Sequence, residues 1–190
     1  RELIDALLTQ RSTTRRETPS PISRRTAEGV YVIAEIGQNH QGELSLAKEL
    51  IHAAKLCGVD AVKSQKRDIM ELLSEEERDR PYSSPHAFGA TYGEHRLALE
   101  LSRDEYAELF AYARSLGMDF FASPWDVSSA KLLEDLGCPL YKIASASLTH
   151  GKLLDTIAGF GKPVVLSTGM STLEEIDQAV ARLQGSELYI

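Results

Sequence analysis

The feature that most constrains the fold of this chain is a regular alternation of short apolar runs with segments of helical periodicity. The apolar runs expected to form strands are residues 30–36, 59–62, 118–122, 140–144, 163–166 and 187–190. A segment with apolar residues at helical spacing follows each run except the last and ends at a glycine. Strands and helices in this order form right-handed βαβ units, so the sequence predicts a parallel sheet.

Capping sequences mark the helix starts. Ser102 with Glu105, and Thr172 with Glu175, have the pattern in which the two side chains satisfy each other's free backbone amides. The expected helices are residues 43–57, 102–116, 126–136, 153–160 and one that follows Thr172. A polar insertion, residues 66–101, separates the second strand from its helix, and could either cover the functional end of the sheet or only decorate it.

Two architectures fit this pattern: an open, doubly wound α/β sheet and a (β/α)8 barrel. Five complete β-α units and the start of a sixth strand are present, whereas a full barrel takes ~200 to more than 400 residues. The chain ends on Leu188, Tyr189 and Ile190, with nothing to cover that strand. This ending indicates a fragment.

Residues 1–28 differ from the rest of the chain in charge and composition. They carry six Lys or Arg and four Asp or Glu, a net charge of +2, so residues 29–190 carry −9 and the whole chain −7. The stretch 11–26 offers little apolar surface to offset its ordering entropy. We expect 1–28 to be a polar, basic tail or linker and 29–190 to be the folded part. A nucleic-acid role is disfavoured, because no aromatic residues lie among the arginines and the rest is acidic.

The sequence also indicates the compartment. No apolar run approaches the ~20 residues of a membrane helix, and the run 3–8 is too short for a signal peptide and is interrupted by Asp5. Cys57 and Cys138 have no metal-like or C-x-x-C spacing, so free thiols are expected. We therefore predict a cytoplasmic protein that binds no membrane.

Polar side chains stand at the expected carboxyl ends of the strands, where barrel enzymes place their functional groups. These residues are Glu35, Lys63, Gln65, Ser123, Lys142, Ser145, Ser167 and Thr168. Lysines supply charge and hydroxyls supply directed donors, so the set predicts an anion site. Strict alternation cannot point both Lys142 and Ser145 inward, so the chain must turn after Ala144 for both to serve.

Each of these residues also has a simpler interpretation. Lys63 could extend to solvent, Glu35 could be a surface carboxylate, and Ser123 could only shape the turn before Pro124. Asp126 is better explained as a helix N-cap than as a catalytic acid. Among the histidines, His40 could contact a substrate and His52 is expected to be exposed. No pair has metal-ligand spacing on a helix, so no metal ligand is assigned to the chain.

Six segments, in order and with natural spacing, resemble the sialic acid synthase family. They are Ala34–His40 with Gly42, Ala61–Lys63 with Gln65, Thr91–Arg96, Ala122–Pro124, Tyr141–Ser145 and Lys162–Met170. The resemblance runs from about Tyr31 to Leu183 and implies a (β/α)8 TIM barrel, here truncated after about five β-α units. It also implies a transferase like N-acetylneuraminate synthase. Such an enzyme condenses phosphoenolpyruvate with an N-acylated hexosamine to a nine-carbon 2-keto sugar acid and releases phosphate.

The resemblance assigns roles to individual residues. It implies that Glu35 acts on the reacting sugar and that Gln65 is a neighbouring site residue. It also implies a divalent metal, Mn2+ or Mg2+, held by later parts of the protein, and a homodimer at full length, so this chain alone is expected to be inactive. The positions that match the phosphoenolpyruvate site are Lys63, Ser123, Lys142, Ser145 and Ser167.

The sequence departs from the family at two positions. Ser147 stands where many members have Glu or Asp, and Ser64 replaces a bulkier residue, so we expect an altered sugar pocket. The acceptor sugar stays open between N-acetylmannosamine and the diacetamido-dideoxy hexoses. Two rival functions are a Schiff-base aldolase with Lys142 as nucleophile and a non-catalytic α/β binding module.

Overall fold

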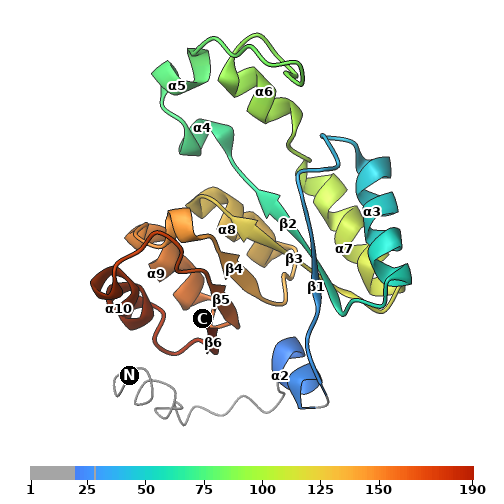
Figure 1. Cartoon of the computed structure of the whole chain (residues 1–190), viewed down its shortest axis with the longest axis vertical. Coiled ribbons are helices and arrows are strands. Elements are labelled where there is room, and N and C mark those ends of the chain that lie inside the picture. Colours follow the sequence, from blue (N-terminus) through green and yellow to red (C-terminus); the bar gives the residue numbers. More distant parts are fainter. Residues whose placement is uncertain (1–19, 28) are drawn as a thin grey trace.

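The computed structural model of the chain describes residues 20–27 and 29–190. Its centre is one parallel sheet in which the strands lie in the order of the sequence, each beside the one before it (Figure 1). The strands are β1 (Ile33–Gly37), β2 (Ala61–Lys66), β3 (Asp119–Pro124), β4 (Tyr141–Ile143), β5 (Val164–Leu166) and β6 (Leu188–Tyr189). A doubly wound sheet reverses its strand order at a switch point, and here the order does not reverse. The predicted barrel-type α/β fold is confirmed.

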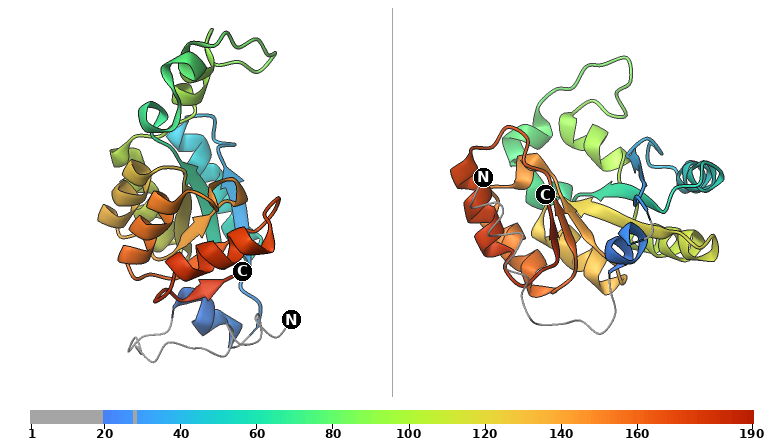
Figure 2. Two further views of the ribbon diagram at one scale, coloured as in Figure 1. Left: turned by 90° about the vertical axis from the view of Figure 1, so that its left-hand side faces the viewer. Right: turned by 60° about the horizontal axis from the view of Figure 1, so that its bottom comes forward.

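The connecting helices flank the sheet in chain order (Figures 1 and 2). They are α3 (Leu44–Leu56), α7 (Arg103–Ser115), α8 (Val127–Asp135), α9 (Gly151–Gly159) and α10 (Leu173–Arg182). Both predicted capping boxes form, at the start of α7 and of α10. The glycines that follow α3 and α8 have φ of 76° and 78°, a left-handed conformation that ends a helix with little steric cost.

The core lies between these helices and the outer face of the sheet. Phe120 of β3 packs against Phe110 of α7, with ring centroids 4.9 Å apart, and Tyr141 of β4 packs against Phe160, 5.4 Å away. Ser64 of β2 also faces α7, where its hydroxyl lies 3.2 Å from that of Tyr106. Residues next to these along each strand, such as Lys63 and Gln65, therefore face the opposite side, which is the inside of the barrel.

The insertion after β2 is a helical excursion beyond the carboxyl end of the sheet (Figures 1 and 2). It contains α4 (Ile69–Leu72), α5 (Glu75–Asp79) and α6 (Tyr92–Ala98), with an antiparallel bridge between Pro81 and Thr91. Its last residues return to the end of β2, where Glu100 accepts a hydrogen bond from the Arg67 amide.

One expectation is wrong at the amino terminus. The predicted solvated linker included residues 20–26, but Pro21–Thr26 form a helix, α2, capped by the Ser20 side chain. Ile22 is 6% exposed in the core, and the Ser23 hydroxyl lies 2.9 Å from the hydroxyl of Tyr189 in β6. Arg25 pairs with Asp60, just before β2, at 2.8 Å. Burial of one apolar side chain and these distant contacts order a segment whose composition alone favours disorder.

Residues 1–19 and 28 lie outside the described residues, so the rest of the expected tail stays a prediction. No helix among the described residues is long and apolar enough to cross a membrane. Cys57 is exposed and Cys138 is buried, and both are free thiols, as the sequence predicted.

Candidate active site at the carboxyl ends of the strands

The centre of the site is an ion pair between the first two strands. Strand register places Glu35 of β1 opposite Lys63 of β2, and Glu35 Oε2 lies 2.5 Å from Lys63 Nζ. Lys63 also donates a hydrogen bond of 2.9 Å to Ser123 Oγ at the end of β3. The Lys63 side chain is 11% exposed and that of Glu35 47% exposed, so the lysine is enclosed while the carboxylate faces outward.

Gln65 extends this group along β2. Its side-chain amide donates to Glu35 Oε1 at 3.4 Å, and its carbonyl oxygen accepts from Arg67 Nη2 at 2.6 Å. Four predicted site residues, from three strands, are thus joined by direct contacts: Glu35, Lys63, Gln65 and Ser123.

Lys142 lies half-buried in the middle of β4, opposite Val165. Burial lowers the pKa of Lys142, and the charge of Lys63 lowers it further, while Glu35 acts in the opposite direction. Lys142 is on β4, the neighbour of the strand that carries Ser123. The three groups together hold two positive charges and one negative charge, which suits an anionic ligand.

The chain turns after β4 as the sequence required. A 3-10 helix, Ser145–Ser147, begins directly after Ala144. The Ser145 side chain faces Gly169 of the loop after β5, since a Cβ on that glycine would lie 3.6 Å from the Ser145 hydroxyl. Ser167 follows β5, and its amide donates to Ile143 at 3.1 Å. Strand position, rather than a side-chain hydrogen bond to Lys63, brings these two serines to the site.

Three other residues have structural roles. Asp126 is the N-cap of α8, as predicted, and accepts from the Ser129 amide at 2.6 Å; burial raises its pKa. His40 is buried in the first loop, and its Nδ1 accepts from the Gly42 amide at 3.1 Å. Ser64 donates to the Gly37 carbonyl at 3.1 Å on the helix side of the sheet. The expectation that Ser64 alters the sugar pocket is therefore wrong, because its strand position turns it away from the barrel interior.

A second group, not predicted from the sequence, lies next to the site. Glu100, at the end of the insertion, accepts from Lys66 Nζ at 2.9 Å and from Gln38 Nε2 at 2.6 Å. Arg67 is 7% exposed, with its guanidinium carbon 4.4 Å from the centre of the Trp125 ring. The available signal was the alternation of Lys63, Gln65 and Arg67, which continues the inner face of β2 past the end of the strand.

The described residues do not form a metal centre. Among them, no group of three or more His, Cys, Asp or Glu side chains is arranged to hold a metal ion. The exposed carboxylate at the site, Glu35, is already paired with a lysine. This set of donors favours binding of an anion over binding of a cation.

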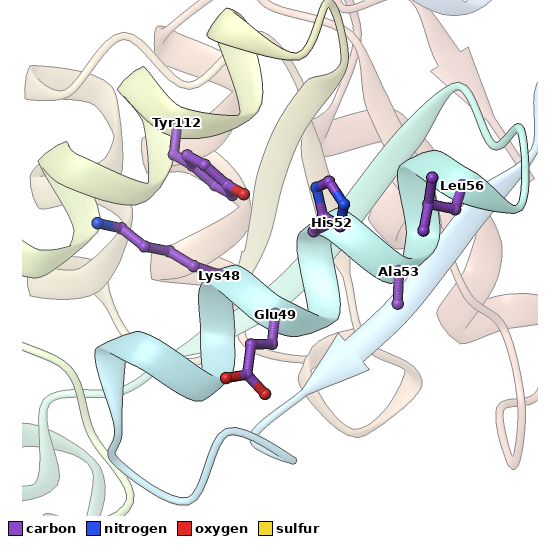
Figure 3. Close-up of a pocket in the computed structure, with 6 residues that line it drawn as sticks. All are labelled: Lys48, Glu49, His52, Ala53, Leu56 and Tyr112. Atoms are coloured by element: carbon purple, nitrogen blue, oxygen red, sulfur yellow. The ribbon is translucent and has the colours of Figure 1, made fainter.

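A surface groove elsewhere on the molecule lies between α3 and α7. Figure 3 shows the side chains that line it: Lys48, Glu49, His52, Ala53, Leu56 and Tyr112. His52 is exposed, as predicted. None of the site residues predicted from the sequence lines this groove.

The chain is similar to proteins of known activity. The sequence profile of the NeuB family matches residues 50–189. N-acetylneuraminate-9-phosphate synthase of Drosophila melanogaster is 42% identical over 165 residues, covering 87% of this chain and 44% of that protein. N,N'-diacetyllegionaminic acid synthase of Campylobacter jejuni is 36% identical over 150 residues, covering 78% of this chain and 45% of that protein.

Solved structures give the same result. The N-acetylneuraminic acid (sialic acid) synthetase of Leptospira borgpetersenii, in complex with citrate, superposes with a TM-score of 0.69 and 30% identity over 83% of this chain and 52% of that one. The chain therefore spans less than half the length of the two curated relatives and about half of this solved structure. The profile match and these relatives show that the chain belongs to the NeuB family, the sialic acid synthase family that its motifs resemble.

Proposed function

We propose that this chain forms the phosphoenolpyruvate-binding part of a transferase that condenses phosphoenolpyruvate with an N-acylated hexosamine. The observation that carries the proposal is the group of Glu35, Lys63, Gln65 and Ser123, with Lys142 close by, at the carboxyl ends of consecutive strands. Phosphoenolpyruvate carries a phosphate and a carboxylate. Two lysines and three serine hydroxyls match those two anionic groups in charge and in donors.

The proposed roles rest on the contacts among Glu35, Lys63, Gln65 and Ser123 and, for the other residues, on strand position and the family resemblance. Lys63 and Lys142 bind and balance the charge of phosphoenolpyruvate, and Ser123, Ser145 and Ser167 donate hydrogen bonds to its oxygens. Glu35, the exposed carboxylate beside Lys63, holds or moves a proton on the acceptor sugar. Gln65 orients Glu35.

The reaction balances with one water molecule. C3 of phosphoenolpyruvate forms a bond to the aldehyde carbon of the open-chain sugar, and water adds at C2. The resulting intermediate loses inorganic phosphate to leave the 2-keto acid. The cationic pocket stabilises the charge that gathers on the phosphate side as the C–O bond breaks.

The proposal also includes a metal, an oligomeric state and a cellular location. A divalent metal, Mn2+ or Mg2+, is expected in the full-length enzyme with ligands outside the described residues, and none of the roles above depends on it. A homodimer and a cytoplasmic location are also expected. On its own, the 190-residue chain is expected to bind phosphoenolpyruvate without turnover, because it spans less than half the length of the related synthases.

Calorimetric titration of the folded chain with phosphoenolpyruvate tests the proposal. We expect saturable binding that inorganic phosphate weakens by competition. A folded chain that releases no heat with phosphoenolpyruvate and shows no shift in melting temperature would contradict the proposal.

A Schiff-base aldolase is the second candidate, and the lowered pKa of Lys142 favours it, because a nucleophilic amine must be neutral. Borohydride reduction in the presence of pyruvate would leave a stable adduct on Lys142 if this alternative were correct. No adduct, together with phosphate release from phosphoenolpyruvate and a hexosamine by the full-length protein, would exclude it.

The acceptor is proposed only as a class. The named products of the relatives, N-acetylneuraminate 9-phosphate and N,N'-diacetyllegionaminic acid, differ in the sugar portion. Phosphate-release assays of the full-length protein with N-acetylmannosamine, its 6-phosphate and a diacetamido-dideoxy hexose would identify the acceptor.

A further inference from the structure

The side chain of Arg67 is the starting point. It follows β2 directly, is 7% exposed, and packs over Trp125 with its guanidinium carbon 4.4 Å from the ring centre. Burial lowers the pKa of Arg67, while Glu100 opposes that change. A buried guanidinium of this kind needs acceptors for its N–H groups.

The described residues give Arg67 few acceptors. Its Nη2 donates to Gln65 Oε1 at 2.6 Å. Its Nη1 has no hydrogen-bond partner among them, and the Glu100 Oε1 atom lies 3.8 Å away. Glu100 is already occupied by Lys66 and Gln38, at 2.9 and 2.6 Å. Among the described residues, the guanidinium therefore has a short hydrogen bond to Gln65 and a longer ion pair with Glu100.

This bond fixes the direction of the Gln65 amide. A guanidinium has only donors, so the end of Gln65 that faces Arg67 must be the carbonyl oxygen. The NH2 end must then point the other way, where it donates to Glu35 Oε1 at 3.4 Å. Without Arg67, the amide would be held only by its longer contact with the partly exposed Glu35 carboxylate, so Gln65 and Glu35 would both be less firmly placed.

We propose that Arg67 is a positioning residue, which acts through Gln65 to hold the Glu35 carboxylate in its working orientation beside Lys63. This inference rests on the proposed function of Glu35. It also gives the insertion a role, because Glu100 at its end holds the Arg67 backbone amide at 3.2 Å and the Lys66 amine. The insertion thus supports the site from outside the barrel.

The first test is a double-mutant cycle in the full-length protein, measured by phosphate release. R67M should lower kcat by about 10- to 100-fold, as expected for a misplaced catalytic group, with the KM for phosphoenolpyruvate unchanged. R67K should restore part of the rate. In a Q65A background R67M should have little further effect, because the route from Arg67 to Glu35 is already cut. Additive losses in the two variants would overturn the proposal.

The control is R96M. Arg96 also packs on an aromatic ring, that of Tyr92, with its guanidinium carbon 5.0 Å from the ring centre. Its Nε donates to the Tyr92 hydroxyl at 2.9 Å. R96M should therefore leave kcat near that of the wild type. A loss in R96M as large as that in R67M would show that any arginine near the insertion matters, and would contradict a specific role for Arg67.

A second measurement needs no turnover. The side-chain amide protons of Gln65, identified by their loss in Q65A, can be followed by NMR in the 190-residue chain. They should move in E35Q, and in R67M they should move to the positions of a free glutamine amide. If R67M leaves them in place, the proposal fails even where the synthase assay succeeds. If these amide signals move but the full-length protein has no synthase activity, the positioning role of Arg67 is supported and the proposed function fails.

Discussion

The two halves of the site are built differently. At the ends of β1, β2 and β3, side chains contact one another directly, from Ser123 through Lys63 and Glu35 to Gln65. At the ends of β4 and β5, the backbone places Lys142, Ser145 and Ser167, and no side-chain hydrogen bond among the described residues joins them. The first half is therefore organised by contacts between its own side chains. In the second half, the organisation comes from the strand ends alone.

The largest expected difference between the halves is in how much phosphoenolpyruvate affinity is lost when each lysine is replaced. K63M removes a cation and also leaves the Glu35 carboxylate unpaired, so it should weaken phosphoenolpyruvate binding by about 100-fold. K142M leaves the Glu35–Lys63 pair intact, and its loss should be about 10-fold. Calorimetric titration of each variant measures both values.

Lys48 provides the matched control for these two lysines, because it lies on α3 and pairs with Glu108 far from the strand ends. K48M should bind phosphoenolpyruvate as the wild type does. If K142M lost more affinity than K63M, the direct contacts of the first half would not be what organises the site.

The pH dependence of binding should come from the second half. Because the pKa of Lys142 is lowered from its ordinary 10.5 by burial and by Lys63, this lysine loses its proton at a lower pH than an exposed lysine does. Phosphoenolpyruvate affinity should therefore fall as the pH rises through that lowered value, and binding there should take up a proton. The same shift makes charged Lys142 unfavourable in the fold, so its contribution to the free energy of unfolding grows as the pH rises toward 10.5.

Titrations from neutral to alkaline pH in buffers of different ionisation enthalpy would detect both the fall and the proton uptake. K142R keeps its charge over this range and should remove the alkaline fall. An unchanged pH profile in K142R would assign the effect to another group.

A smaller effect, of opposite sign, is expected at Glu35. This carboxylate competes with phosphoenolpyruvate for Lys63 in the ligand-free site. E35Q should therefore raise phosphoenolpyruvate affinity by about 5-fold, the size of a partly exposed ion pair, while it abolishes condensation in the full-length protein. Weaker binding in E35Q would mean that Glu35 organises Lys63 more than it competes for it.

The smallest effect on phosphoenolpyruvate binding is expected from a substitution in α2, away from the site residues. I22A removes a buried side chain from α2 and should lower the free energy of unfolding by about 2 kcal/mol. Phosphoenolpyruvate affinity should not change, because α2 contacts Asp60 and Tyr189 rather than the strand ends. Thermal melts and calorimetry on the same samples would separate the two properties.

Sequence alone was sufficient for the features that depend on local pattern. The alternation of strands and helices and the capping boxes at Ser102 and Thr172 follow from periodicity and short-range chemistry. The choice of a barrel over a doubly wound sheet needed the family resemblance as well. The contacts of Lys63 with Glu35 and Ser123 also follow, because parallel strands bring their carboxyl ends together.

The remaining features depend on contacts that are distant in sequence. Glu100 reaches Lys66 across the whole insertion, and no periodicity predicts where an insertion returns. Arg67 was visible only as the next inward position of β2. The helix α2 was missed because its stability comes from Tyr189 and the core, although Ser20 and Pro21 already supplied an N-cap and a first helical residue.

The docking of α2 has a consequence for the order in which the molecule assembles. Its partner on the sheet, Tyr189, is 166 residues away from Ser23 along the chain. Ribosomal synthesis therefore delivers this helix long before the surface that receives it, and closing so long a loop is a slow event in folding. The strands can pair one after another as they are synthesised. Helix α2, in contrast, can make its contact with Tyr189 only after β6 has formed.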